Sequence, residues 1–92
     1  MAAERMIIDF ANTFLKQLRK LSRQDRVRVD RTIQIFRENP FDLSLRNHKL
    51  KGNQKNIRSI SAGYDLRLLY REENDHAIVL FIEVGTHEKV YP

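Results

Sequence analysis

The sequence predicts an α+β domain in which an N-terminal helical hairpin packs on a small antiparallel β-sheet. Two observations support this prediction. Apolar residues recur at helical spacing before residue 40, whereas after residue 56 they alternate with polar residues or run continuously. A chain of 92 residues can build one hydrophobic core. We therefore expect a single domain over residues 1–92.

The first predicted helix follows a short apolar stretch. Met6–Phe10 is compatible with an N-terminal edge strand and equally with the start of the helix behind it. Phe14, Leu18 and Leu21 then recur at helical spacing. Asn12 stands just before them, and its side chain type favours the N-cap position. The pattern predicts an amphipathic helix that begins after Asn12.

A second helix is predicted over residues 22–38. Ser22 stands three residues before Asp25, which is a typical capping arrangement at the start of a helix. Pro40 disfavours helical geometry at the residue before it and has no amide hydrogen. The helix is therefore expected to end near Glu38, and the two helices form a hairpin with one apolar face.

The last third of the chain predicts the strands of the sheet. Leu66, Leu68 and Tyr70 alternate with polar residues, as in a strand with one buried face. A polar turn is expected at Glu72–Asp75. Ala77–Val84 is apolar at almost every position, which favours a central strand covered on both faces. These two strands are expected to form an antiparallel hairpin, preceded by a strand that contains Arg58.

Other segments have a less regular pattern. Phe41–Lys55 has no clean period, and we expect a connection without regular structure, of the kind that is often functional. Tyr64 and Tyr70 are interpreted as packing residues. His76 falls in the predicted turn and is expected to be exposed to solvent.

Charge and composition limit the classes of function. The net charge is +5, and basic residues outnumber acidic ones eight to two between residues 16 and 37 and seven to one between residues 46 and 71. This excess of positive charge favours a polyanion or an acidic protein as the binding partner. There is no cysteine, and no apolar run approaches the roughly 20 residues of a membrane-spanning helix. We expect a cytoplasmic protein that does not bind a membrane.

Metal and nucleotide sites are not expected. His48, His76 and His87 lack the spacing of metal ligands, and there is no cysteine to complete a zinc site. The three glycines are not grouped into a phosphate-binding loop. The sequence therefore predicts chemistry without a metal or another cofactor.

His48, Asp65 and His87 suggest acid–base chemistry on RNA. Cleavage of RNA needs a base for the 2′-hydroxyl and an acid for the departing 5′-oxygen, and imidazole suits both roles because its usual pKa lies near neutral pH. The cations that would offset phosphate charge are Lys49, Lys51, Arg58 and Arg67. Tyr91 is compatible with stacking on a base or donating its hydroxyl, and equally with sealing the edge of the sheet.

These residues also carry a resemblance to a known family. The helical hairpin, Lys49–Gly52 and the strand with Arg67 and Tyr70 resemble the RelE/ParE superfamily of bacterial type II toxins. His48, Asp65 and the segment Gly85–His87 resemble its YafQ branch of mRNA interferases. The resemblance covers nearly the whole chain.

The resemblance implies a RelE-like fold and a ribosome-dependent endoribonuclease that cuts translated mRNA in the ribosomal A site. It implies that a tightly bound antitoxin, expected to be acidic, silences the toxin. The catalytic positions of the branch fall on His48, Asp65 and His87. Tyr91, also expected at the catalytic site, falls on a terminal aromatic position that is phenylalanine in the YafQ branch and tyrosine in RelE. Lys49 and Lys51 fall on positions that contact substrate phosphates. Ser61 departs from the pattern, because the YafQ branch has a further catalytic histidine there.

Three alternatives stay open at this point. A ParE-like toxin would share the fold but inhibit DNA gyrase, and a non-enzymatic module would only bind nucleic acid or ribosomes. Ser61 also leaves room for a toxin with reduced activity. Neither of the first two alternatives requires His48, Asp65 and His87 together.

Overall fold

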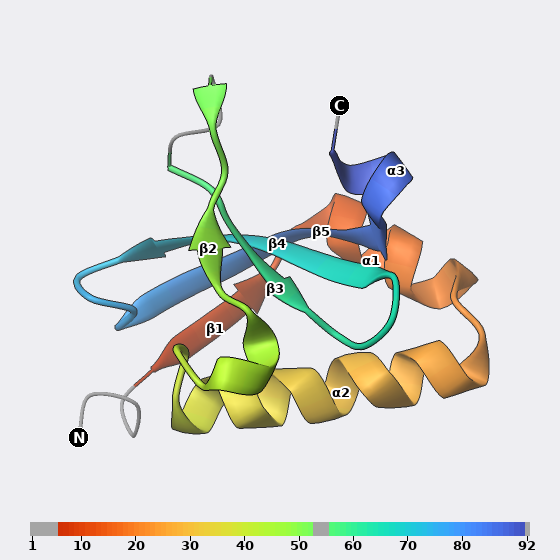
Figure 1. The fold of residues 1–92 in the computed structure, drawn as a ribbon, viewed down its shortest axis with the longest axis horizontal. Helices are drawn as coiled ribbons and strands as arrows, with labels where there is room; N and C mark the ends of the chain where they lie inside the picture. Colours follow the sequence, from red (N-terminus) through yellow and green to blue (C-terminus); the bar gives the residue numbers. More distant parts are fainter. Residues whose placement is uncertain (1–5, 53–55, 92) are drawn as a thin grey trace.

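The computed structural model describes residues 6–52 and 56–91 and confirms the predicted α+β class. Its elements, in chain order, are β1 (Ile7–Phe10), α1 (Asn12–Lys20), α2 (Arg23–Glu38), the 3₁₀ helix η2 (Leu43–Leu45), β2 (His48–Lys49), β3 (Arg58–Ser61), β4 (Leu66–Glu73), β5 (Ile78–Thr86) and α3 (His87–Val90). In Figure 1, α2 runs along one side of the sheet and α3 lies on the other side.

The sheet has five strands in the order β1-β5-β4-β3-β2. β1 is an edge strand, as one reading of Met6–Phe10 predicts, and it pairs parallel with β5. The other three pairs are antiparallel. The sheet is therefore mixed, which requires a long connection between β1 and β5. The helical hairpin and the three intervening strands supply that connection.

The prediction that Asn12 caps the first helix is wrong, because the N-cap is Ala11 and makes no side-chain cap. The amide of Ala11 donates to the carbonyl of Phe81 at 2.9 Å, and its own carbonyl accepts from Leu15. Ala11 therefore makes a hydrogen bond at the end of the β1–β5 ladder and is also the N-cap of α1. At α2 the prediction is confirmed, since the Ser22 hydroxyl accepts from the amide of Asp25 at 3.1 Å.

Aromatic side chains from both helices meet the sheet on one face. Phe36 of α2 lies 4.8 Å from Tyr70 and 5.3 Å from Phe81, measured between ring centroids. Phe14 of α1 lies 5.7 Å from Phe81. All four side chains are fully buried. The prediction that the sheet covers the apolar faces of the two helices is confirmed. Burial of this apolar area stabilises the fold.

An irregularity between β4 and β5 keeps apolar side chains on this helix-facing side. Leu69 pairs with Glu83 and Tyr70 pairs with Phe81, so Ile82 has no partner. The extra residue restores Val84 to the helix-facing side. Its amide donates to Oε1 of Gln17 in α1 at 2.8 Å. β5 is central, as predicted, but Ile82 is only half-buried, so its second face is not fully covered.

The opposite face of the sheet carries polar residues. Ile60 pairs with Leu68 and lies in the core, so its neighbours Ser59 and Ser61 point to the other face. Ser61 pairs with Arg67 there. His48 pairs with Ser59 across β2 and β3 and shares its face. The second face therefore collects polar and basic groups from β2, β3 and β4.

Residues 41–55 are more regular than the sequence predicts, within the part the structure describes. The Asp42 carboxylate accepts from the amide of Ser44 at 3.0 Å and starts η2. Arg46 then adopts a left-handed backbone with φ of 52° and leads into β2. Local side-chain bonds and pairing with β3 thus organise a segment that has no hydrophobic period.

The prediction that His76 is exposed is wrong, because its residue is only 7% exposed. β4 extends to Glu73, and Asn74, Asp75 and His76 all have positive φ, which folds the turn back onto the core. The His76 ring lies 5.2 Å from Phe41 between centroids.

The packing role predicted for Tyr64 is also wrong, since this residue is 96% exposed in the turn before β4. Tyr70 is fully buried, as predicted. The two tyrosines differ because Tyr70 lies within a strand that packs on α2, whereas Tyr64 lies beyond the strand's start.

Candidate active site

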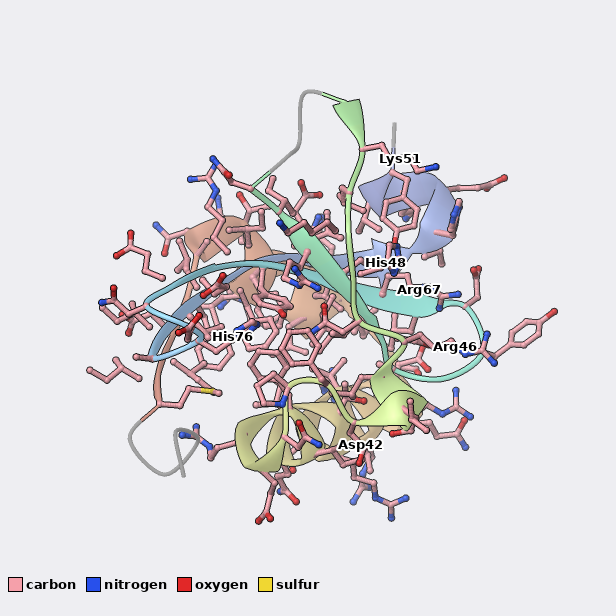
Figure 2. All side chains as sticks on the ribbon, turned by 60° about the vertical axis from the view of Figure 1, so that its left-hand side comes forward. Asp42, Arg46, His48, Lys51, Arg67 and His76 are labelled. Atoms are coloured by element: carbon pink, nitrogen blue, oxygen red, sulfur yellow. The ribbon has the colours of Figure 1, made fainter. Side chains whose placement is uncertain are left out.

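The polar face of the sheet contains a hollow of about 310 Å³. Its lining comes from segments that are far apart in the sequence: Arg46, His48, Ser61, Arg67, His87 and Tyr91. Four of these are predicted site residues, namely His48, Arg67, His87 and Tyr91. Figure 2 shows Arg46, His48 and Arg67 close together beside β2, with Lys51 farther along the same segment.

A neighbouring backbone carbonyl fixes which ring nitrogen of His48 carries the hydrogen. Its Nδ1 lies 2.9 Å from the carbonyl oxygen of Arg46. A carbonyl oxygen only accepts hydrogen bonds, so Nδ1 carries the hydrogen and donates it. In the neutral ring, Nε2 then has a free lone pair. The residue is exposed at the hollow, so Nε2 is able to accept a proton from a bound molecule.

His87 begins the short helix α3 and Tyr91 is its C-cap, an element that was not predicted from the sequence. Their rings lie 4.3 Å apart between centroids, with planes at 81°. The amide of Tyr91 donates to the carbonyl of His87 at 3.1 Å. The Tyr91 hydroxyl is hydrogen-bonded to the hydroxyl of Ser59, which is completely buried. Tyr91 is thus held at both its backbone and its ring, and it does not seal the edge of a strand.

Arg67 places a fixed positive charge at the rim of the hollow. Its Nη1 donates to Ser61 Oγ at 3.3 Å, to the carbonyl of Gly63 at 3.3 Å and to that of Leu66 at 3.1 Å. The Ser61 hydroxyl donates to the same Gly63 carbonyl at 3.0 Å. Ser61 therefore lines the hollow and holds Arg67, although a hydroxyl cannot carry protons as an imidazole does at neutral pH.

Arg46 is a lining residue that was not predicted from the sequence. It is exposed, and its backbone is left-handed, which non-glycine residues adopt only under local constraint. In the sequence, the only sign that Arg46 belongs to the site was its position two residues before His48. The left-handed turn that brings it to the hollow follows η2, which has no clear pattern in the sequence.

The other predicted site residues lie outside the lining of the hollow. Lys49 pairs with Arg58 and so points to the face opposite His48. The Arg58 Nε donates to Asn47 Oδ1 at 2.8 Å, and its guanidinium lies 5.2 Å from the centroid of Phe41. Lys51 and Asp65 are exposed beyond the end of β2 and before the start of β4.

The charge of the lining determines which ligands fit. It contains two guanidinium groups and two imidazoles, and none of its six residues is acidic. Over residues 6–52 and 56–91, no group of three or more histidine or acidic side chains is arranged to hold a metal ion. Within the same residues, no helix has the length and apolarity needed to cross a membrane. The hollow is suited to an anion such as a phosphate group.

Solved structures with the same fold include several toxins. The crystal structure of YafQ from Escherichia coli BL21(DE3) matches with a TM-score of 0.78 and 19% identity, covering 95% of this chain and 99% of that one. YafQ in the E. coli DinJ–YafQ toxin–antitoxin complex gives 0.77 and 20%, covering 96% and 99%. The archaeal RelE–RelB complex from Pyrococcus horikoshii OT3 gives 0.73 and 15%, covering 94% and 99%.

Comparison at the level of sequence identifies the family. No curated protein sequence matches the chain. The family model described as the bacterial toxin of type II toxin–antitoxin systems, YafQ, matches residues 6–92, nearly the whole length. The chain therefore belongs to the YafQ family of type II toxins.

Proposed function

We propose that this toxin is a ribosome-dependent endoribonuclease that cleaves translated mRNA by general acid–base catalysis without a metal ion. One observation carries the proposal: two imidazoles and two guanidiniums line a single hollow on one face of the sheet. Membership of the YafQ family supports the same activity. The volume of the hollow, about 310 Å³, leaves room for a phosphate with parts of the two nucleotides that it joins.

His48 is the base in this mechanism. Its Nε2 takes the proton of a 2′-hydroxyl, because Nδ1 already donates to the carbonyl of Arg46. The 2′-oxygen then attacks the adjacent phosphorus, and the bond from phosphorus to the 5′-oxygen breaks. Asp65 is the alternative base on sequence grounds, but it is not part of the lining.

His87 is the acid. In its protonated form it gives its proton to the departing 5′-oxygen, while the ring of Tyr91 lies against it. Arg46 and Arg67 offset the charge that builds on the phosphate. The products are a 2′,3′-cyclic phosphate and a 5′-hydroxyl. Lys51, which is exposed beyond the end of β2, is assigned to the flanking RNA backbone, whereas Lys49 and Arg58 point to the opposite face of the sheet and have no assigned role at the hollow.

The ribosome and an antitoxin are the proposed partners. Arg46, His48 and His87 are exposed at the site, so a ribosome that holds mRNA in its A site would supply much of the positioning that this small protein lacks. The relatives YafQ and RelE have been solved in complexes with DinJ and RelB. We extend this pairing to an acidic antitoxin that binds the basic surface of this chain.

The test is to express the chain under tight control and to map the 5′ ends of cellular mRNA. We expect cuts in phase with codons for the wild type and none for His48→Ala or His87→Ala. Arg31→Ala is the matched control, because Arg31 is exposed on α2, on the side of the sheet away from the hollow. Growth arrest that persists in both histidine variants without such cuts would exclude the nuclease and favour a gyrase inhibitor or a binding module.

A further inference from the structure

A polar network lies behind the hollow, on the helix-facing side of the sheet, and Asn47 is its centre. The Asn47 Nδ2 donates to the carbonyl of Pro40 at 2.8 Å and to the hydroxyl of Tyr70 at 2.7 Å. Its Oδ1 accepts from Nε of Arg58 at 2.8 Å. One side chain thus joins the segment after α2 to β3 and β4, and both amide hydrogens are used.

The partners of Asn47 are themselves fixed. The Tyr70 hydroxyl lies 2.7 Å from Nε2 of His76. Since the Tyr70 oxygen accepts from Asn47, its own hydrogen is free to be donated to His76. Burial raises the pKa of Tyr70 to about 12 and lowers the pKa of His76, so both groups are neutral near pH 7. The hydrogen bonds therefore all run in one direction. Arg58 donates to Asn47, Asn47 donates to Tyr70, and Tyr70 donates to His76.

Asn47 stands between two residues that line the hollow. Arg46 and His48 point to the hollow, whereas the side chain of Asn47 points into the network behind it. The carbonyl of Arg46 is also the acceptor for Nδ1 of His48. Any movement of this three-residue segment therefore moves a cation, the imidazole and the hydrogen bond that sets its tautomer.

The backbone of Arg46 explains why this segment needs an anchor. Its φ of 52° is a left-handed conformation that a residue with a Cβ adopts only when its surroundings impose it. β2 is only two residues long, so strand pairing alone supplies few hydrogen bonds here. The three side-chain bonds of Asn47 are the further constraint on the segment.

We propose that Asn47 is a positioning residue, which holds Arg46 and His48 at the hollow and keeps the His48 hydrogen on Nδ1. This inference rests on the proposed nuclease function for its kinetic consequence. Its structural consequence, the tautomer of His48, is independent of that function. Asn47 does not reach the hollow and takes no part in proton transfer.

The test compares Asn47→Ala, Asn47→Asp and a control at a buried polar residue outside the network. Asn47→Asp keeps the acceptor for Arg58 but loses both donors. Thr32→Val is the control, because Thr32 is buried on α2 and its hydroxyl donates to the carbonyl of Arg28 at 2.7 Å, away from the hollow. The measurements are the ¹⁵N chemical shifts of the His48 imidazole and the cleavage of an mRNA programmed on ribosomes.

For Asn47→Ala we expect kcat to fall by about 10²-fold with KM changed by less than about threefold, since misplacement of a catalytic group lowers the rate more than the binding. The ¹⁵N shifts of His48 should move towards a mixture of the two tautomers. Asn47→Asp should show the same changes to a smaller extent. It provides the test if Asn47→Ala does not fold. Thr32→Val should keep both wild-type kinetics and wild-type shifts.

Unchanged His48 shifts and unchanged kcat in a folded Asn47 variant would overturn the positioning role. Equal losses of kcat in Thr32→Val and Asn47→Ala would do the same, because they would indicate a general loss of stability. Failure of the nuclease proposal is recognised separately: the wild type itself would then produce no cuts in ribosome-bound mRNA, whatever the tautomer shifts of the Asn47 variants.

Discussion

His87 is the first residue of α3 and Tyr91 is its C-cap, and their ring centroids lie 4.3 Å apart with ring planes at 81°. The edge of one ring therefore meets the face of the other. The hydroxyl of Tyr91 points away from this contact to the buried hydroxyl of Ser59. His87 is thus held by a ring that is itself anchored to β3.

Tyr91→Phe and Ser59→Ala are expected to lower cleavage by similar, modest factors of under about tenfold, because both remove the same hydrogen bond. The double variant should be little worse than either single variant, as holds for two partners in one interaction. The measurement is single-turnover cleavage of mRNA on ribosomes. A far larger loss in Tyr91→Phe alone would show that the hydroxyl acts on the substrate directly.

His48→Ala should reduce the rate of cleavage by about 10²–10⁴-fold, the usual contribution of a general base. Asp65→Ala should reduce it by less than about tenfold, since Asp65 does not line the hollow. Both residues are exposed, so neither change should affect folding. The reverse order of the two losses would transfer the role of base to Asp65.

Arg46→Ala should weaken the binding of an RNA oligonucleotide more than Arg31→Ala, because only Arg46 lines the hollow. Binding should fall as salt rises, and the slope of log K against log[salt] should become shallower by about 0.7 for Arg46→Ala, as expected on loss of one contact to single-stranded RNA. Titrations at several salt concentrations measure both effects. Equal slopes for the two variants would remove Arg46 from the phosphate-binding set.

His76 should make stability depend on pH. Its pKa is lowered, chiefly by burial and secondarily by Arg58, while Glu72 and Asp75 act in the opposite sense. The unfolded chain then binds a proton more readily than the folded protein between the lowered pKa and 6.5. This contribution to stability is present above pH 6.5 and is lost as the pH falls through that window.

Urea unfolding between pH 5 and pH 7.5 should therefore give midpoints that fall towards acid in the wild type. The fall should be smaller in His76→Asn, which lacks the titrating ring. His48→Asn is the control, because His48 is exposed. Parallel curves for the wild type and His76→Asn would show that other groups cause the acid loss.

Phe36→Ala should lower the free energy of unfolding by about 3–5 kcal/mol, the usual cost of removing a buried phenyl ring. Phe36 is fully buried and contacts Tyr70, Phe81 and His76. Ile35→Ala is the comparison on the same helix, because Ile35 is 39% exposed and should cost much less. Chemical denaturation measures both, and equal losses would place the main core contact of α2 elsewhere.

Periodicity predicted the long elements well because burial and local geometry act in the same direction there. The α2 helix begins at its serine cap and ends before Pro40, as the sequence indicates. Short elements were missed, since η2, β2 and α3 depend on single side-chain bonds or on pairing with distant strands. The burial of His76 was missed because Asn74, Asp75 and His76 are residue types that tolerate a left-handed backbone, but their types alone do not show that the turn folds back onto the core.

The sequence by itself determined the α+β class, the extent of α2, the approximate positions of the two long strands, and which imidazoles and cations the chain contains. These follow from local propensity and from the period of apolar residues. Only the tertiary structure decided which of the predicted site residues meet. Cross-strand register turns His48 towards the hollow and Lys49 away from it, and a one-residue irregularity between β4 and β5 keeps Val84 in the core. Register depends on contacts between residues far apart in the chain, and no local pattern records it.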